Sequence, residues 1–337
     1  NQAYETSLAM RTDAPYYTRF GQMEGTVFIR LLDDMRAEGW NDKADKLEAV
    51  MHARADRWKG EAYPFGSEMP WDSTGQEEVY AWTRYFGDTA KSKVCIDAIT
   101  GYMPAVPHWA YNGCARRYWD FEYGGSKTPR LERMIHHYGS SLNAIPILSD
   151  YRDRPDDIYL LRIGYGGMMG SLSNIDQDGF PSMAFHTFPD TMKWDPITGD
   201  YGLNFFGHAY NSATYIVNHP DFGWQAFGGN LTQSGNTISV TPLDSVRRRV
   251  YLAPAGLWLT LDAGQFSRLD YDSQAHTVQI TLAPSDSHTP SARLRIEQPA
   301  TISGIGTYAP TGTYTQERGA YVVPLGSSTT TVSLAAK

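Results

Sequence analysis

The chain is poor in cysteine, and its cysteines do not form a metal-binding pattern. Its 337 residues contain only Cys95 and Cys114, with no CxxC, HExxH or other zinc-like spacing. Zinc and thiolate sites need several such ligands close together, so the sequence argues against a metal–thiolate site. The two thiols are compatible with one disulfide or with two buried free cysteines.

Long apolar runs, excess positive charge and nucleotide-binding loops are missing as well. No apolar run approaches the roughly 20 residues that a membrane-spanning helix requires. The net charge of −8 argues against nucleic acid as a partner, because phosphate binding needs a basic face. The sequence also has no GxGxxG, Walker or GxSxG pattern, which disfavours a dinucleotide fold, a phosphate-binding loop and a serine hydrolase.

Aromatic residues are abundant, at 13% of the chain with 22 Tyr and 9 Trp. The richest stretch, residues 107–125, holds six aromatic side chains beside His108, Asn112, two adjacent arginines and two acids. A hydrophobic core does not need this mixture, since buried charges and amides are costly unless they are paired. A sugar-binding cleft does, because rings stack on sugar faces while polar groups bond hydroxyl and acidic groups. The sequence therefore predicts an enzyme that acts on carbohydrate.

The first half of the chain predicts paired helices joined by short turns. Apolar residues recur there at helical spacing, and Ser73 and Thr74 followed by Glu77 and Glu78 make a capping-box pattern. We expect helices over residues 24–38, 41–55, 73–86, 89–99, 130–138, 140–149 and 156–169.

From about residue 228 the pattern changes to short runs of β-forming residues between Gly, Asp and Pro turns. Their spacing of about ten residues predicts an antiparallel β-sandwich. The expected fold class is α+β multidomain. A helical-hairpin portion of an (α/α) toroid spans 1–170, a loop-rich region around the site spans 171–227, and the β-sandwich spans 228–337. This order resembles the C-terminal part of carbohydrate-active enzymes built from such a toroid and a trailing β-domain.

The expected helices are too few for a closed toroid, and the chain begins at Asn1 rather than Met. We therefore expect a removed signal peptide or a longer upstream region, and the upstream part of the same polypeptide as a partner. A sequon at Asn230 and Thr232, few Lys relative to Arg, and a Thr/Ser/Gly-rich tail are typical of a secreted protein.

One set of candidate catalytic residues lies around the start of the helix expected over 73–86. Trp71, Asp72, Glu77 and Glu78 combine a ring with carboxylates, and paired carboxylates serve as general acid and base in glycoside hydrolysis. Adjacent side chains point about 100° apart on a helix, so only one of Glu77 and Glu78 could face a cleft. The competing interpretation is helix N-terminal charge favoured by the dipole and the capping box.

A second set, His108, Tyr111, Asn112, Arg116 and Arg117, matches the needs of elimination from a uronic acid. A cation or amide must neutralise the carboxylate, which acidifies the neighbouring C–H group. A Tyr or His must remove that proton, and an acid must protonate the leaving oxygen. The competing interpretation is a helix start with surface ion pairs.

Two histidines, His136 and His137, precede Tyr138 and Gly139 at the end of an expected helix. Adjacent side chains point in different directions, so we expect one histidine to face the cleft and the other to pack. A satisfied core histidine is the competing interpretation.

Asn174, Asp176 and Asp178 match the first half of an EF-type calcium loop. The residue expected to be the bidentate glutamate is Phe185, which excludes an EF-hand. A different oxygen-ligated Ca²⁺ site and a tight acidic turn both remain open. Further along, His186 and His208 share a loop-rich stretch and could line the cleft, since loops commonly carry such residues.

Four segments resemble a family of large secreted bacterial and fungal proteins that is catalogued mainly as a domain of unknown function. They are residues 71–80, 107–113, 136–139 and 178–186. The family is similar in layout to toroid-plus-sandwich polysaccharide lyases, among them rhamnose–glucuronate lyases of plant gum degradation. The resemblance covers residues 15 to 270 or so. It implies as candidate catalytic residues His108, Tyr111, Asn112, Arg116, His137 and Tyr138.

The leading hypothesis is a secreted polysaccharide lyase that acts by β-elimination at a uronic acid in an acidic oligo- or polysaccharide. In it Arg116 or Arg117 holds the carboxylate with Asn112, while rings of Trp71, Trp109 and Trp119 stack on sugars. The alternatives are a glycoside hydrolase that uses Glu77 or Glu78 with Asp72, and a non-catalytic glycan-binding protein. Besides Ca²⁺, no cofactor is expected.

Overall fold

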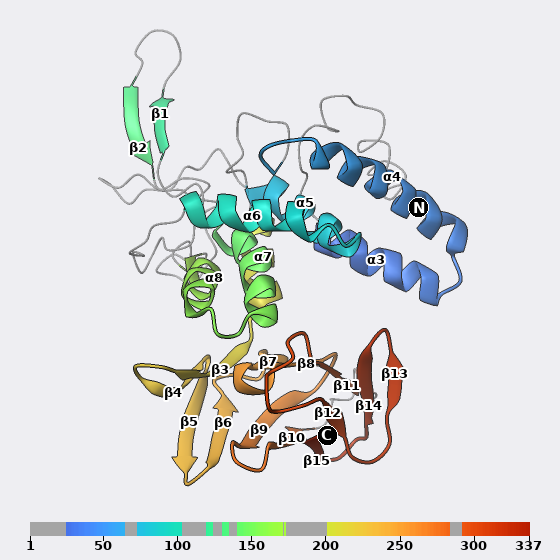
Figure 1. Ribbon diagram of the computed structural model, residues 1–337, viewed down its shortest axis with the longest axis vertical. Coiled ribbons are helices and arrows are strands. Elements are labelled where there is room, and N and C mark those ends of the chain that lie inside the picture. Colours follow the sequence, from blue (N-terminus) through green and yellow to red (C-terminus); the bar gives the residue numbers. More distant parts are fainter. Residues whose placement is uncertain are drawn as a thin grey trace. The chain divides into compact units, whose positions relative to one another are not determined.

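The computed structural model describes residues 25–64, 73–102, 119–123, 130–134, 140–170, 172, 201–283 and 292–337. These residues fall into two compact units. The first takes its described residues from Asn1–Asp150 and Tyr159–Asn211 and is mainly helical (Figure 1). The second takes them from Tyr151–Ile158 and Ser212–Lys337 and is built mainly of strands. The predicted α+β class is confirmed.

The described part of the first unit has seven helices and one small hairpin. The helices are α3 (Gly25–Ala37), α4 (Asn41–Lys59), α5 (Ser73–Tyr85), α6 (Thr89–Tyr102), α7 (Ser140–Asp153), α8 (Ile158–Gly170) and α9 (Tyr201–Asn211). Consecutive helices pack in pairs, α3 on α4 and α5 on α6, and α3 also lies against α5. None of the helices in the described residues is long and apolar enough to cross a membrane.

Helix α4 shows why these segments are helical. Its buried residues Ala44, Leu47, Met51, Ala55 and Trp58 recur every three or four positions and form one apolar stripe. Burial of that stripe against neighbouring helices stabilises α4, because isolated helices of this length are marginal in water.

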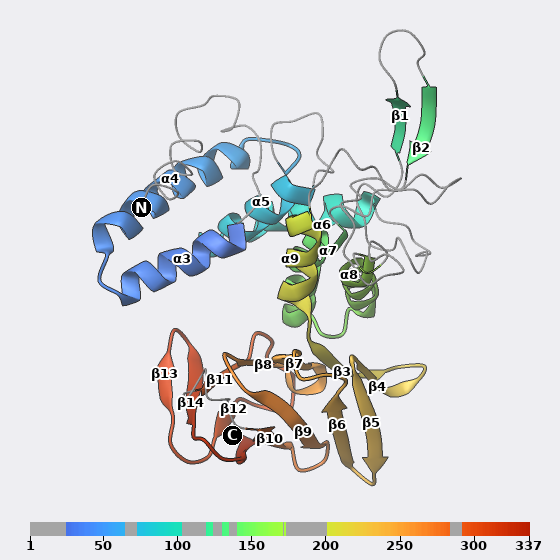
Figure 2. The same cartoon turned by 180° about the vertical axis from the view of Figure 1, so that it is seen from behind.

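Two glycines allow α8 and α9 to approach α7 closely. A Cβ atom on Gly207 would lie 2.4 Å from the carbonyl oxygen of Ser141, and one on Gly164 would lie 2.6 Å from Cγ of Leu148. Figure 2 shows α9 beside α7. The missing side chain at Gly164 thus lets the backbone of α8 approach α7.

The second unit contains a seven-stranded and a six-stranded sheet. The first has the order β13 (Thr315–Glu317), β14 (Ala320–Leu325), β11 (Ala292–Glu297), β8 (Leu257–Leu261), β7 (Arg249–Leu252), β3 (Thr214–His219) and β4 (Gly223–Phe227). The second has the order β12 (Tyr308–Pro310), β15 (Thr330–Ala336), β10 (Thr277–Ala283), β9 (Gln265–Asp272), β6 (Thr237–Pro242) and β5 (Gly229–Ser234). Neighbours are antiparallel except for β3 and β7, which are parallel. A 3₁₀ turn, η2 (Ala253–Ala255), connects β7 to β8.

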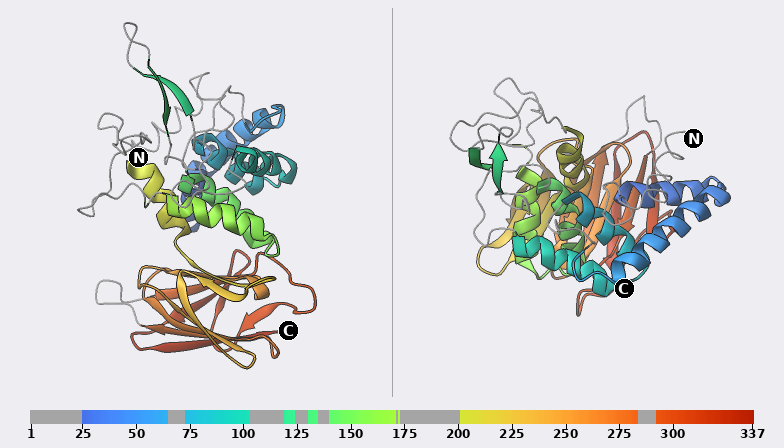
Figure 3. Two further views of the ribbon diagram at one scale, coloured as in Figure 1. Left: turned by 90° about the vertical axis from the view of Figure 1, so that its left-hand side faces the viewer. Right: turned by 90° about the horizontal axis from the view of Figure 1, so that it is seen from above.

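Both sheets contribute to one hydrophobic core. Along several strands every second side chain is buried, as Leu257, Leu259 and Leu261 show on β8. Val278 and Ile280 on β10 supply the same alternation from the six-stranded sheet. Figure 3 shows the strands of this unit from two further sides.

The second unit contains an aromatic cluster of Tyr151, Tyr215, Tyr251 and Trp258, in which Tyr151 comes from the chain segment Tyr151–Ile158. The hydroxyl of Tyr251 donates to the carbonyl oxygen of Arg152 at 2.8 Å, and this bond is buried. The guanidinium of Arg152 lies 4.4 Å from the ring centroid of Trp258, within the range of a cation–π interaction.

The prediction of a helix over residues 130–138 is wrong at residues 130–134, the part of it that the structure describes. Arg130–Met134 is strand β2, paired antiparallel with β1 (Trp119–Tyr123). The partner strand is rich in aromatic residues, which favour strands, and its pairing supplies backbone hydrogen bonds that local helix propensity does not anticipate.

The prediction of a loop-rich region over residues 171–227 differs from the structure at residues 201–227. Helix α9 begins at Tyr201, and β3 and β4 occupy Thr214–His219 and Gly223–Phe227. The run of buried residues from Thr214 to Val217 belongs to a strand covered on both faces, so the alternation that marks other strands is missing.

Candidate functional site

Most of the predicted site residues lie outside the described residues. They are Trp71, Asp72, His108, Trp109, Tyr111, Asn112, Arg116, Arg117, His137, Tyr138, Asn174, Asp176, Asp178 and His186. Trp119 begins strand β1, where the structure describes the backbone alone. Glu77 and Glu78 are the predicted catalytic residues whose side chains are described.

Glu77 caps helix α3 from the neighbouring helix α5. Its Oε2 atom accepts from the amide of Gly25 at 2.8 Å, and its Oε1 atom accepts from the amide of Thr26 at 2.8 Å. The Thr26 hydroxyl also donates to Oε1. These amides belong to the first turn of α3 and have no partner within their own helix. The carboxylate therefore lies where the helix dipole favours negative charge.

The close approach of α3 to α5 explains why a glycine begins α3. A Cβ atom on Gly25 would lie 2.7 Å from Cα of Glu78, closer than side-chain atoms approach. Burial raises the pKa of Glu77, while its three hydrogen bonds, from the Thr26 hydroxyl and from the amides of Gly25 and Thr26, act in the opposite direction.

Glu78 points to a different neighbour, Arg54 on α4. The guanidinium donates from Nη2 to Oε2 of Glu78 at 2.9 Å, and both side chains are almost fully buried. The same guanidinium lies 5.0 Å from the ring centroid of Trp58. The expectation that Glu77 and Glu78 point apart is confirmed, but both carboxylates are turned into the packing between helices.

This arrangement argues against direct chemistry at either acid. A general acid or base must lie within hydrogen-bond reach of the reacting group. Glu77 is 1% exposed and Glu78 is 0% exposed, and each is held by a group of the protein. The structure therefore gives both residues a structural role in joining α3, α4 and α5.

Arg54 is the polar residue of this cluster that sequence reasoning missed. It lies on the apolar stripe of α4, between Met51 and Trp58. A charged residue within a buried stripe requires an acidic partner, so its position was the available signal.

Hairpin β1–β2 connects two of the predicted site segments. The strand register pairs Trp119 with Met134 and Tyr123 with Arg130. Residues 119–123 of the stretch 107–125 thus pair with residues 130–134, which directly precede the segment of His136, His137 and Tyr138 in the sequence.

Cofactor ligands are limited in the described residues. No group of three or more His, Cys, Asp or Glu residues is arranged there to hold a metal ion. The predicted calcium ligands lie outside the described ranges, so that site stays a prediction. Cys95 is a buried free thiol whose pKa is raised by burial to about 12, which disfavours the reactive thiolate.

His208 is a cleft candidate that the structure places on a helix rather than in a loop. It belongs to α9, and its Nδ1 atom lies 2.9 Å from the carbonyl oxygen of Met168 on α8. This contact joins two helices of the first unit.

Comparison with known proteins gives the chain a family. No curated protein matches the sequence. The model of the family described as "Family of unknown function (DUF5695)" matches residues 1–333. That match spans nearly the whole chain, so the protein belongs to the family of unknown function DUF5695.

Proposed function

We propose that the chain belongs to a secreted polysaccharide lyase that cleaves a glycosidic bond by β-elimination at a uronic acid. The observation that carries the proposal is the composition of residues 107–125, which combine arginines, an amide, a histidine and six aromatic residues.

In the proposed reaction, Arg116 or Arg117 with Asn112 holds the substrate carboxylate. The held charge acidifies the adjacent C5–H group. Tyr138, Tyr111 or His137 removes the C5 proton, and the electron pair forms a C4=C5 double bond as the C4–O bond breaks. The leaving oxygen takes a proton from an acid of the site. Trp71, Trp109 and Trp119 stack on neighbouring sugars.

The pairing of β1 with β2 supports a common site for the two segments. In an antiparallel hairpin the two outer ends lie side by side, here at Trp119 and Met134. Arg117 lies two residues before that end, and His136 lies two residues after it. Arg117, a candidate for binding the carboxylate, and His137 and Tyr138, candidates for proton transfer, are thus joined by the chain to the same end of the hairpin.

The order of the two units supports the fold part of the proposal. Paired helices precede a unit whose two sheets share one core, as in an (α/α) toroid followed by a β-sandwich. The likeness of layout is an argument by analogy, and the chemistry rests on the site residues. The proposed substrate is an acidic plant or microbial polysaccharide, with Ca²⁺ at Asn174, Asp176 and Asp178 as a proposed ligand.

Hydrolysis by Glu77 or Glu78 with Asp72 is the alternative that the described contacts disfavour, because both glutamates are buried and bonded to protein groups. A non-catalytic glycan-binding protein is the third candidate. It would use the aromatic residues of 107–125 without proton transfer.

The deciding experiment incubates the full chain with a panel of acidic polysaccharides and follows ultraviolet absorbance of the conjugated C4=C5 double bond. We expect absorbance to rise with an acidic polymer and not with the same polymer after chemical reduction of its carboxyl groups. New reducing ends without that absorbance would indicate hydrolysis and overturn the lyase proposal. Binding without any product would favour the non-catalytic protein.

A further inference from the structure

The second unit contains a cavity that the proposed lyase site does not use. It measures about 310 Å³ and lies where β12, an edge strand of one sheet, faces the end of β11 and the β13–β14 hairpin of the other. Ligand pockets for small molecules commonly begin at this size. Leu257, Ile296, Tyr308 and Ala320 are buried at its floor.

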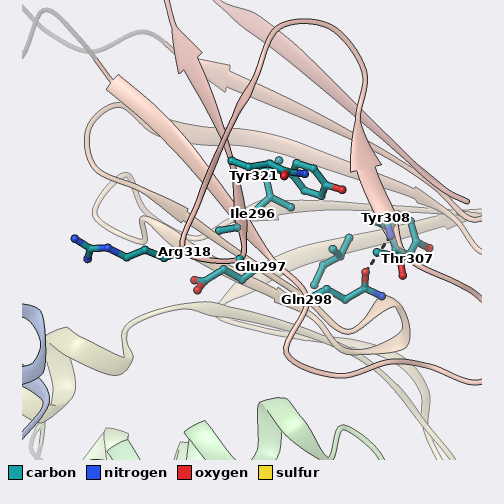
Figure 4. Close-up of a pocket in the computed structure, with 11 residues that line it drawn as sticks. Ile296, Glu297, Gln298, Thr307, Tyr308, Arg318 and Tyr321 are labelled. Atoms are coloured by element: carbon teal, nitrogen blue, oxygen red, sulfur yellow. Dashed lines mark hydrogen bonds between the residues drawn. The ribbon is translucent and has the colours of Figure 1, made fainter. Parts of the chain in front are cut away.

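Polar groups and one ring surround this floor. Glu297, Gln298 and Tyr321 are half-buried in the walls, and Thr307 and Gln316 are exposed at the rim. Figure 4 shows Thr307 and Tyr308 on one side of the gap, with Tyr321 above and Glu297 and Gln298 below. An apolar floor with a few converging polar groups is typical of a binding site.

The cavity wall is held in place by Gln298. Its Nε2 atom donates to the carbonyl oxygen of Gly306 at 3.0 Å, and its Oε1 atom accepts from the amide of Tyr308 at 2.9 Å. A Cβ atom on Gly306 would lie 2.4 Å from the carbonyl oxygen of Lys337. The amide of Lys337 also donates to the carbonyl oxygen of Thr307 at 2.9 Å, so the segment before β12 is bonded on both sides.

Arg318 occupies an unfavourable backbone position at the mouth of this cavity. Strands β13 and β14 are joined by a two-residue turn, Arg318 and Gly319, with φ values of 50° and 75°. Turns with two positive φ values favour Asn-Gly, and an arginine at the first position is disfavoured. Such an outlier motivates a functional hypothesis for its side chain. Figure 4 shows its guanidinium extending away from the other lining residues.

We propose that this cavity binds a neutral sugar residue of a glycan chain. The ring of Tyr321 and the apolar floor receive a face of the sugar, Glu297 and Gln316 bond its hydroxyl groups, and Arg318 contacts the next residue outside. The carboxylate of Glu297 accepts from Nη2 of Arg295 at 3.2 Å, so the wall carries a balanced ion pair rather than a spare cation for a uronate. The site therefore differs in ligand charge from the proposed lyase site, and it requires no reaction.

Two variants separate binding from folding. Arg318→Asn removes the guanidinium and creates the favoured Asn-Gly turn, so the variant should fold at least as stably as the parent. Arg295 donates from Nη1 to the Glu317 carbonyl oxygen at 3.2 Å and from Nη2 to that of Arg318 at 3.4 Å, and the substitution keeps both backbone acceptors. Glu297→Gln removes the carboxylate charge at nearly constant shape and keeps a side-chain oxygen that can accept from Nη2 of Arg295, which donates to Glu297 at 3.2 Å.

The matched control is His276→Asn. His276 is the other non-glycine residue with positive φ in the described part of the chain, at 51°, and it does not line the cavity. This substitution relieves the same kind of backbone strain on the β9–β10 connection. It should leave glycan binding unchanged.

The test titrates the full chain with cellohexaose, xylohexaose, mannohexaose and arabinohexaose, and with a galacturonate hexamer for comparison, by calorimetry. We expect at least one neutral hexamer to bind with a dissociation constant of about 1 mM or tighter. Arg318→Asn and Glu297→Gln should each weaken that binding about tenfold, while the melting temperature of Arg318→Asn does not fall.

Three outcomes would overturn the proposal: no neutral hexamer binds, both variants bind as well as the parent, or the control loses binding equally. The readout needs no product, so a chain without lyase activity can still support this site. Equally, an active lyase whose neutral-sugar binding is absent would refute the site alone.

Discussion

The guanidinium of Arg54 donates to the carboxylate of Glu78 at 2.9 Å, with both side chains almost fully buried between α4 and α5. Removing one partner of a buried pair leaves an uncompensated charge, whereas replacing both by apolar groups is often neutral. Arg54→Ala should therefore lower the free energy of unfolding by about 3–5 kcal/mol. Arg54→Met combined with Glu78→Leu should recover most of that loss. Urea unfolding of the full chain measures both, and a loss below about 1 kcal/mol for Arg54→Ala would contradict the assignment.

The raised pKa of Glu77 predicts that the free energy of unfolding depends on pH. Its pKa is raised in the folded chain, chiefly by burial, so the folded state binds the proton more tightly than the unfolded state. The stabilisation from protonation is present in full below the unfolded carboxyl pKa of about 4.3. It is lost as pH rises through the raised folded pKa. We expect the parent to lose stability relative to Glu77→Gln over that interval, measured by urea unfolding at a series of pH values. Parallel stability curves would contradict this role.

Gly207 and Gly101 form a matched pair of helix glycines. Alanine at Gly207 would place a methyl group 2.4 Å from the Ser141 carbonyl, whereas Gly101 has nothing within 4 Å of its added Cβ. Gly207→Ala should reduce the free energy of unfolding by about 1–3 kcal/mol through overpacking. Gly101→Ala should raise it by about 0.5–1 kcal/mol through helix propensity. Thermal unfolding compares them, and equal effects would show that α9 does not pack on α7 this closely.

Tyr251→Phe removes the hydroxyl that donates to the Arg152 carbonyl at 2.8 Å. The buried carbonyl loses its partner, so the free energy of unfolding should fall by about 1 kcal/mol. Tyr159→Phe is the control, because Tyr159 is 42% exposed. Its melting temperature should match that of the parent. If the free energy of unfolding of Tyr251→Phe equalled that of the parent, a water molecule would have replaced the lost donor.

Arg116→Ala and Arg117→Ala test the proposed carboxylate-binding role. At least one of them should abolish turnover of an acidic polysaccharide while the melting temperature stays nearly unchanged. Arg268→Ala, an exposed arginine of strand β9, should leave turnover unaffected. Full activity in both variants, measured by product absorbance, would remove the arginines from the proposed mechanism.

Local pattern predicted much of the secondary structure. The helical spacing of Ala44, Leu47 and Met51 predicted α4, and the short runs of β-forming residues after about residue 228 predicted strands, among them β10, whose buried residues alternate. In both elements the buried residues recur with the period of the backbone, which is about 3.6 residues in a helix and about two in a strand.

The pattern failed where strand pairing or full burial decided the backbone. Arg130–Met134 became a strand because Trp119–Tyr123 pairs with it, and β3 shows no alternation because its first four residues are all buried. Neither cause is visible within a short window of sequence.

The sequence by itself determined the α+β class, the periodic elements and the separation of Glu77 from Glu78, because helix geometry turns adjacent side chains apart. Only the tertiary structure decided what each carboxylate does. Their partners, Gly25 and Arg54, lie 52 and 24 residues away along the chain. Packing of α5 against α3 and α4 turned two candidate catalytic acids into a helix cap and a buried ion pair. In the second unit, the packing of the two sheets brought their edges together around a cavity that no local sequence motif predicts.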